Sequence, residues 1–163
     1  MTVIGQDRVG LVESIARLVA DHGGNWLESR MCRLGGEFAG ILRIHVPAEK
    51  RAALEQALKQ LKDLSVVVRA DDAAQTAGET RLASLVVIGP DRPGIVREMT
   101  AALAAQGVNV EELATECASA PMSGEPLFQA RAKLRLPAGV AADDLRQAVD
   151  KAIPGLTVEV SFA

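Results

Sequence analysis

An internal repeat constrains the fold of this 163-residue chain more than any other feature. The segment Gly5-Gln6-Asp7-Arg8-Val9-Gly10-Leu11-Val12 returns 84 residues later as Gly89-Pro90-Asp91-Arg92-Pro93-Gly94-Ile95-Val96. At this offset, 11 of the 26 positions from Val3/Val87 to Glu28/Glu112 are identical. After a gap of six residues the halves align again, with Phe38 over Phe128 and Pro47 over Pro137. A repeat of this length indicates two copies of one structural unit.

Each half has the same pattern of predicted strands and helices. A strand rich in aliphatic residues (82–88 in the second half) leads through the Gly-Asp-Arg turn into a helix that is followed by Gly23 or Gly107. A hairpin, a second helix and a last strand follow. In the returning hairpin strand of the second half, apolar residues alternate with polar ones, which predicts one helix-covered and one polar sheet face. The order βαββαβ, twice, predicts an α+β chain of two tandem ferredoxin-like domains with antiparallel sheets.

Composition places the boundary between the halves at residues 71–80. This stretch has three acidic residues, no basic residue and no apolar periodicity, as is typical of a solvated linker. We therefore expect domains at residues 1–70 and 81–163. The first predicted strand of domain 1 covers only Met1 to Ile4, so it is short by a few residues. Either the start codon lies upstream or this strand is a stub, and an intact mass of 17.2 kDa would exclude the first alternative.

Composition and charge argue against several classes of function. A net charge of −3 and 2 % aromatic residues do not suit a nucleic-acid surface, which needs basic charge and aromatic platforms. No apolar run reaches the roughly 18 residues of a membrane-spanning helix, so we expect no membrane partner. Cys32 and Cys117 stand far apart, which suits a cytoplasmic protein. With His22 and His45 they show no nucleophile–base spacing, so we expect no catalysis, no metal and no cofactor.

The repeated Gly-x-Asp-Arg-x-Gly turn is the candidate ligand site. The helix start offers N–H groups that suit a carboxylate, and the Asp carboxylate suits an ammonium, so one turn can recognise both ends of an amino acid. The structural alternatives are that Asp7 and Asp91 are helix N-caps, and that Gly10 and Gly94 only permit tight helix–sheet packing. The arginines that follow the aspartates would then be solvated salt-bridge partners.

Taken together, these residues resemble the ACT domain, a βαββαβ module that senses small molecules, mostly amino acids. The resemblance rests on the turn with its following [Leu/Ile]-Val, on Gly-x-Asn eleven residues after that Val in both copies, and on Glu28 and Glu112. Residues 23–30 and 34–38 are similar to the first domain of the glycine cleavage system transcriptional repressor family, which consists of two tandem ACT domains and little else. The amino-terminal segment of formyltetrahydrofolate deformylase looks similar too, but its catalytic domain has no room here.

The resemblance implies a set of binding residues. In paired ACT domains a ligand lies between the strand–helix turn of one domain and the second strand of its neighbour. The residues carried over are Asp7, Arg8, Gly10, Leu11, Val12, Asn25 and Glu28 in the first copy, and Asp91, Arg92, Gly94, Ile95, Val96, Asn109 and Glu112 in the second. Val9 replaces the Pro more usual at this turn, whereas Pro93 keeps it. Trp26 is much larger than its counterpart Val110, so the two sites would differ in volume.

The resemblance also implies a non-catalytic regulator. A small amino acid, glycine or serine, would bind at the turn and change how the domains pack, and a DNA-bound transcription activator would respond as the protein partner. We expect no direct nucleic-acid contact, because the sequence has no helix-turn-helix and no basic helix. Antiparallel sheet edges need covering, so either the two domains pair edge to edge within the chain or two chains do so, and we expect a homodimer. The rival interpretation is a structural or protein-interaction ACT module that binds no ligand.

Overall fold

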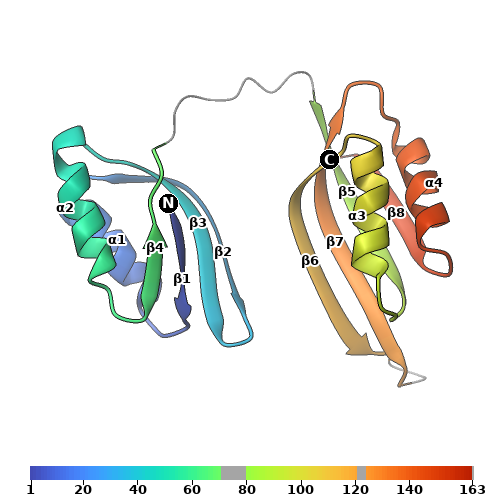
Figure 1. The fold of residues 1–163 in the computed structure, drawn as a ribbon, viewed down its shortest axis with the longest axis horizontal. Coiled ribbons are helices and arrows are strands. Elements are labelled where there is room, and N and C mark those ends of the chain that lie inside the picture. Colours follow the sequence, from blue (N-terminus) through green and yellow to red (C-terminus); the bar gives the residue numbers. More distant parts are fainter. Residues whose placement is uncertain (71–79, 121–123, 163) are drawn as a thin grey trace. The chain divides into compact units, whose positions relative to one another are not determined.

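The computed structural model describes residues 1–70, 80–120 and 124–162, and the chain divides into two compact units, unit 1 (residues 1–74) and unit 2 (residues 75–163) (Figure 1). Unit 1 contains β1 (Thr2–Gln6), α1 (Leu11–Asp21), β2 (Asn25–Leu34), β3 (Glu37–His45), α2 (Ala48–Lys59) and β4 (Leu64–Val67). Unit 2 contains β5 (Thr80–Pro90), α3 (Ile95–Ala105), β6 (Asn109–Ser119), β7 (Pro126–Pro137), α4 (Ala142–Ala152) and β8 (Thr157–Phe162).

The two sheets are antiparallel and have the same topology. Their strand orders are β2-β3-β1-β4 and β6-β7-β5-β8, so the first and third strands of each unit are central. Both second strands have a register irregularity at the same point of the repeat, between Trp26 and Glu28 and between Val110 and Glu112. This arrangement confirms the predicted pair of tandem ferredoxin-like domains.

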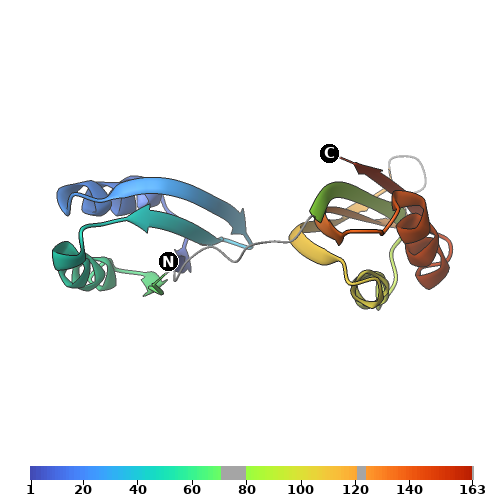
Figure 2. The ribbon, with the colours of Figure 1, turned by 90° about the horizontal axis from the view of Figure 1, so that it is seen from above.

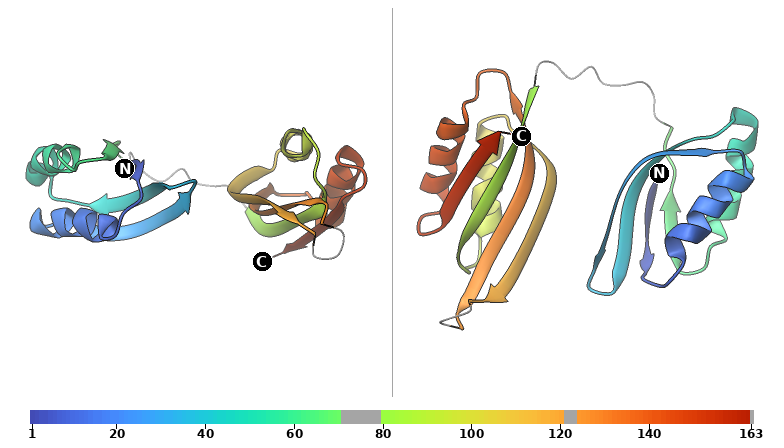
Figure 3. Two further views of the ribbon diagram at one scale, coloured as in Figure 1. Left: turned by 90° about the horizontal axis from the view of Figure 1, so that it is seen from below. Right: turned by 180° about the vertical axis from the view of Figure 1, so that it is seen from behind.

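In each unit the two helices pack on one face of the unit's own sheet, as the view from above shows (Figure 2). The view from behind shows the strands of unit 2 in front of α3 (Figure 3, right). The inward residues of β7 are buried, among them Phe128 and Leu134, whereas Arg131 and Lys133 between them are exposed. The alternation predicted for this strand is therefore confirmed.

Glycines end the first helix of each unit in the predicted way. Gly23 and Gly107 have φ values of 69° and 68°, a left-handed conformation that glycine adopts at little cost. The N–H of Gly23 donates to the carbonyl of Ala20, and the N–H of Gly24 donates to that of Val19. Unit 2 repeats this pair of bonds, so both helices end in a Schellman motif.

The hydrophobic core is larger in unit 2. Among the described residues, the buried cluster of unit 2 has sixteen apolar members and that of unit 1 has eight. The first strand is also longer in unit 2, because β5 has 11 residues and β1 has 5. Because stability rises with the apolar area removed from water, unit 1 is expected to be the less stable unit.

The predicted boundaries differ from the structure at two points. β1 extends to Gln6, beyond the predicted end at Ile4. Residues 71–79 of the predicted linker lie outside the described residues, and β5 begins at Thr80. No helix in the described part of the chain is long and apolar enough to cross a membrane.

Candidate functional site

The repeated turn connects the first strand to the first helix in both units. The residues before α1 and α3 are Gly10 and Gly94, which have left-handed φ values of 82° and 96°. No described side chain caps either helix. The first N–H groups of both helices therefore keep the partial positive charge that suits a carboxylate.

The two structural alternatives for this turn are wrong. The aspartates do not cap the helices, because the glycines occupy the N-cap position and no side chain bonds to it. Tight packing does not explain Gly10 either, since a Cβ there would meet no atom within 4 Å. A left-handed backbone conformation requires the glycine. Alanine at Gly94 would thus destabilise the helix start whether or not a ligand binds there.

The aspartates have different partners in the two units. The carboxylate of Asp7 accepts a hydrogen bond of 2.6 Å from Nε of Arg33 near the end of β2. Cys117 occupies the position of Arg33 in the repeat and lies beside Asp91. Local desolvation and the adjacent Asp91 carboxylate raise the pKa of the Cys117 thiol, so this partner stays neutral at pH 7. Asp7 is therefore compensated by a cation of its own unit, whereas Asp91 is next to an uncharged thiol.

The arginines of the turn also differ. Nη2 of Arg92 donates a hydrogen bond of 2.6 Å to Oε2 of Glu98 in the first turns of α3. Ser14 replaces Glu98 in unit 1, and its hydroxyl donates to the carbonyl of Gly10. Among the described residues, Arg8 forms no ion pair. The turn of unit 1 thus presents a guanidinium, and that of unit 2 presents a carboxylate.

The helix residues of the candidate set divide into buried and exposed ones. The side chains of Leu11 and Ile95 belong to the cores and are 3 % and 2 % exposed, so only their backbone can meet a ligand. Val12 and Val96 are 42 % and 39 % exposed. They provide the apolar surface next to the free N–H groups.

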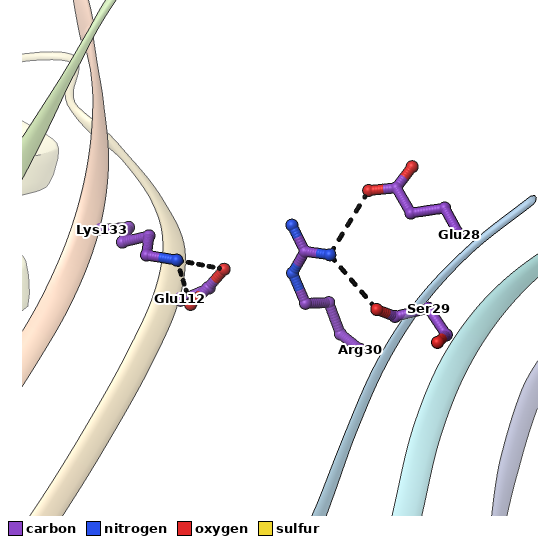
Figure 4. A network of polar contacts seen from close by, with 5 residues as sticks. All are labelled: Glu28, Ser29, Arg30, Glu112 and Lys133. Atoms are coloured by element: carbon purple, nitrogen blue, oxygen red, sulfur yellow. Dashed lines mark hydrogen bonds and ion pairs between the residues drawn. The ribbon is translucent and has the colours of Figure 1, made fainter. Parts of the chain in front are cut away.

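The strand residues of the candidate set lie away from the turn of their own unit. Asn25 and Glu28 are at the start of β2, and α1, with 11 residues and a length of about 16 Å, separates this point from the turn. Glu28 forms an ion pair with Arg30, and Glu112 forms one with Lys133 (Figure 4). Asn109 donates to Oε1 of Glu111. Within one unit, then, the structure does not bring these residues to the turn.

Ion pairs between β6 and β7 compensate the basic strip of unit 2. Arg131 pairs with Glu116, Lys133 with Glu112, and Arg135 with Glu111. A strip neutralised in this way does not form a surface for phosphate groups, because its cations already have partners.

The sequence interpretation missed three residues of the site, namely Arg33, Glu98 and Cys117. Each touches the turn through a side chain, yet none belongs to the repeated motif. The offset of 84 aligns Arg33 with Cys117 and Ser14 with Glu98. These unmatched pairs were the signal that the two turns differ chemically.

The other reactive side chains of the described residues lie apart from the turns. Cys32 is exposed, and Nδ1 of His22 lies 2.7 Å from the carbonyl oxygen of Leu18. Within the described ranges, no group of three or more His, Cys, Asp and Glu residues is placed to hold a metal ion.

Two of the paired glutamates of unit 2, Glu98 and Glu111, predict a dependence of its stability on pH. Hydrogen bonds from Arg92 and from Arg135 lower the pKa of Glu98 and of Glu111 below the ordinary value of 4.5. A carboxyl group whose pKa is lower in the folded state than in the unfolded state stabilises the fold at pH values above its unfolded-state pKa. This stabilisation is lost as the pH falls through the folded-state pKa. We expect the free energy of unfolding of unit 2, measured in urea, to fall between pH 5 and pH 3. The double variant Glu98→Gln, Glu111→Gln should flatten this slope, and an unchanged slope would contradict the assignment.

Comparisons with known proteins agree with this geometry. Residues 1–71 match the family model of the ACT domain. The chain is 27 % identical over 152 residues to the glycine cleavage system transcriptional repressor of Escherichia coli (strain K12), covering 91 % of this chain and 80 % of the relative. The Shigella flexneri repressor matches with the same identity and coverage.

Two solved structures match over the whole chain. A protein of unknown function from Galdieria sulphuraria is 31 % identical, with a TM-score of 0.84, over 99 % of this chain and 95 % of the other. A candidate glycine cleavage system transcriptional repressor shares the fold at 20 % identity, with a TM-score of 0.69, over 99 % and 94 % of the two chains. Residues 1–71 therefore match the ACT domain family, unit 2 repeats the fold of unit 1, and the chain as a whole is similar to the glycine cleavage system transcriptional repressors.

Proposed function

We propose that this chain is a non-catalytic regulator that binds a small amino acid at its strand–helix turn and modulates transcription through a protein partner. The observation that carries the proposal is the duplicated turn. In both copies a left-handed glycine precedes the helix, and no side chain caps the first N–H groups of that helix. Each turn also contains an aspartate. The names of the relatives favour a regulatory role and point to glycine. We propose serine, another small amino acid, as the next candidate.

Unit 2 is the better site for the ammonium group of the ligand. Asp91 lies beside the neutral thiol of Cys117 and forms no ion pair with any described residue, whereas Asp7 already accepts a hydrogen bond from Arg33. An amino-acid ammonium would gain a charge-assisted hydrogen bond from Asp91 without displacing a cation. The carboxylate of the same ligand would lie at the start of α3, near the exposed Val96.

A thermal-shift screen of the twenty amino acids at millimolar concentration tests this proposal. A ligand present at 100 times its Kd stabilises the folded state by about 2.7 kcal/mol, which raises the Tm measurably. We expect glycine or serine to raise the Tm of the parent chain. Asp91→Asn should abolish the shift because it removes the carboxylate, and Cys117→Arg should abolish it because it introduces the cation found in unit 1.

Asp7→Asn is the matched control, and it should keep the ligand-induced shift. Loss of the shift in Asp7→Asn alone would assign the ammonium site to unit 1 and overturn the assignment to Asp91. No shift with any amino acid in a folded parent would support the rival function, an ACT module for protein interaction without a ligand. The existing Asp7–Arg33 pair is the observation that favours this rival, because it satisfies the turn of unit 1 internally.

The partner is proposed to be a DNA-bound transcription activator. The net charge of −3 and the paired cations of β7 do not suit direct binding to the DNA backbone. A homodimer would cover the edge strands of the two sheets, β2 and β4 or β6 and β8. Light scattering at two protein concentrations measures this oligomeric state.

A further inference from the structure

The first turns of α3 carry an ion pair that has no counterpart in α1. Nη2 of Arg92, in the repeated turn, donates a hydrogen bond of 2.6 Å to Oε2 of Glu98. In unit 1 the place of Glu98 is taken by Ser14, whose hydroxyl donates to the carbonyl of Gly10 at 2.8 Å. The ion pair is therefore a property of unit 2 and not of the repeat.

The carboxylate of Glu98 lies at the start of α3. Its Oε1 atom is 3.3 Å from the position that a Cβ on Gly94 would occupy, and Gly94 immediately precedes the helix. The hydrogen bond from Arg92, together with the charges of Arg92 and Arg97, lowers the pKa of Glu98 and keeps this carboxylate ionised at neutral pH. Unit 2 thus holds a carboxylate of its own at the place where the carboxylate of the proposed ligand would lie.

The ion pair is open to exchange with a ligand. The side chains of Arg92 and Glu98 are 36 % and 29 % exposed. An ion pair that water reaches is weak, because solvent and salt screen the two charges, so a second carboxylate can replace the first. The guanidinium keeps its positive charge throughout such an exchange, because arginine does not lose its proton in proteins.

We propose that Glu98 is a specificity-determining residue of the unit 2 turn, because it competes with the carboxylate of the ligand for the guanidinium of Arg92. On binding, the carboxylate of the amino acid takes the place of Glu98 on Arg92, while the ammonium group meets Asp91. A ligand that lacks a carboxylate leaves the Arg92–Glu98 pair closed. This inference rests on the proposed binding of an amino acid at the turn of unit 2, and it names the residue that limits that binding.

The loss of Glu98 should act in opposite directions on two kinds of ligand. For an amino acid, the guanidinium of Arg92 becomes free and a like charge disappears, so binding becomes tighter. For an amine without a carboxylate, Arg92 is left without its counter-charge and repels the cation. Comparison of the two kinds of ligand therefore distinguishes competition for Arg92 from a general change in the stability of the turn.

Glycine and glycinamide provide this comparison, because both carry an ammonium group and only glycine carries a carboxylate. Their Kd values are measured at pH 7 by isothermal titration calorimetry with the full chain, and serine and serinamide are measured in parallel. In Glu98→Ser and in Glu98→Gln we expect the Kd of the amino acid to fall by about threefold or more, as the loss of an exposed competing ion pair allows. The Kd of the amide should not fall. Glu98→Ser introduces the residue of unit 1, whose hydroxyl bonds to the carbonyl of the preceding glycine, so this variant preserves the helix start.

Two further variants complete the design. Asp150→Asn is the matched control, because it removes one carboxylate from an ion pair of similar exposure, formed with Arg146 on α4. It should leave the Kd of the amino acid unchanged, which excludes an effect of net charge. Arg92→Gln should raise that Kd by about fivefold or more, because it removes the guanidinium for which the two carboxylates compete.

The outcomes separate this inference from the proposed function. If an amino acid binds the parent chain and its Kd is the same in both Glu98 variants, Glu98 does not compete and the inference is wrong, whereas the proposed function stands. Equal tightening of the amide, or equal tightening in Asp150→Asn, would also overturn the inference. If neither glycine nor serine binds the parent chain or any variant, the proposed function and this inference fall together.

Discussion

Gly5→Ala is expected to unfold unit 1 while unit 2 keeps its structure. A Cβ at Gly5 would overlap the carbonyl oxygen of Asp63 and lie 3.0 Å from Cα of Leu64. Both atoms belong to the backbone, and Gly5 pairs with Leu64 in the sheet, so neither can move away without breaking the β1–β4 pairing. Overpacking of a core typically destabilises a protein by about 1–3 kcal/mol. Because the added Cβ would clash with backbone atoms, we expect the loss of stability to reach or exceed the upper end of this range.

The chain contains its own reporter for this experiment. Trp26 is the only tryptophan, and it packs against the core of unit 1. In Gly5→Ala we expect the fluorescence of Trp26 to shift to that of a solvated indole, while circular dichroism retains the signal of one folded unit. A unit of about 70 residues has a total stability of about 4–10 kcal/mol, so a loss of this size removes much of it.

Gly89→Ala is the matched variant in unit 2. A Cβ there would lie 2.8 Å from Cγ of Leu156 and 3.0 Å from its Cα. We expect the reverse result, with part of the circular dichroism lost and the Trp26 signal unchanged. If Gly5→Ala and Gly89→Ala both abolish the two signals together, the units do not fold independently and the expectation is wrong.

The features that the sequence predicted well are those that the backbone itself dictates. Gly23 and Gly107 follow α1 and α3 in left-handed conformations, as expected, because few other residues adopt them cheaply. The alternation along β7 predicted the buried face, because successive strand residues point to opposite sides. Duplication strengthened each of these predictions, since both copies had to satisfy it.

The features that the sequence did not predict depend on which residues meet across the fold. The Asp7–Arg33 contact joins the turn to the far end of β2, and its existence depends on the register of the hairpin. Asp is a common N-cap, yet here a glycine takes that position, because the turn itself adopts a left-handed conformation.

Leu134→Ala is the second variant with a large expected effect. Leu134 lies on the central strand β7, between Ala83 of β5 and Val110 of β6, and it is fully buried. Truncation of a buried leucine costs about 2–5 kcal/mol, because the transfer free energy is lost and a cavity remains. Urea denaturation followed by circular dichroism should show the unit 2 transition at lower denaturant, with the Trp26 transition unchanged.

Ile44→Ala provides the matched comparison, because Ile44 has the place of Leu134 in the repeat. Ile44 is only partly buried and borders an open cavity that Leu54 and Leu58 of α2 also line, so fewer atoms surround it and its removal opens less new space. We expect this variant to lower the stability of unit 1 by about 1 kcal/mol, well below the cost of Leu134→Ala. Equal costs for the two substitutions would contradict this expectation and show that Ile44 is packed as tightly as Leu134.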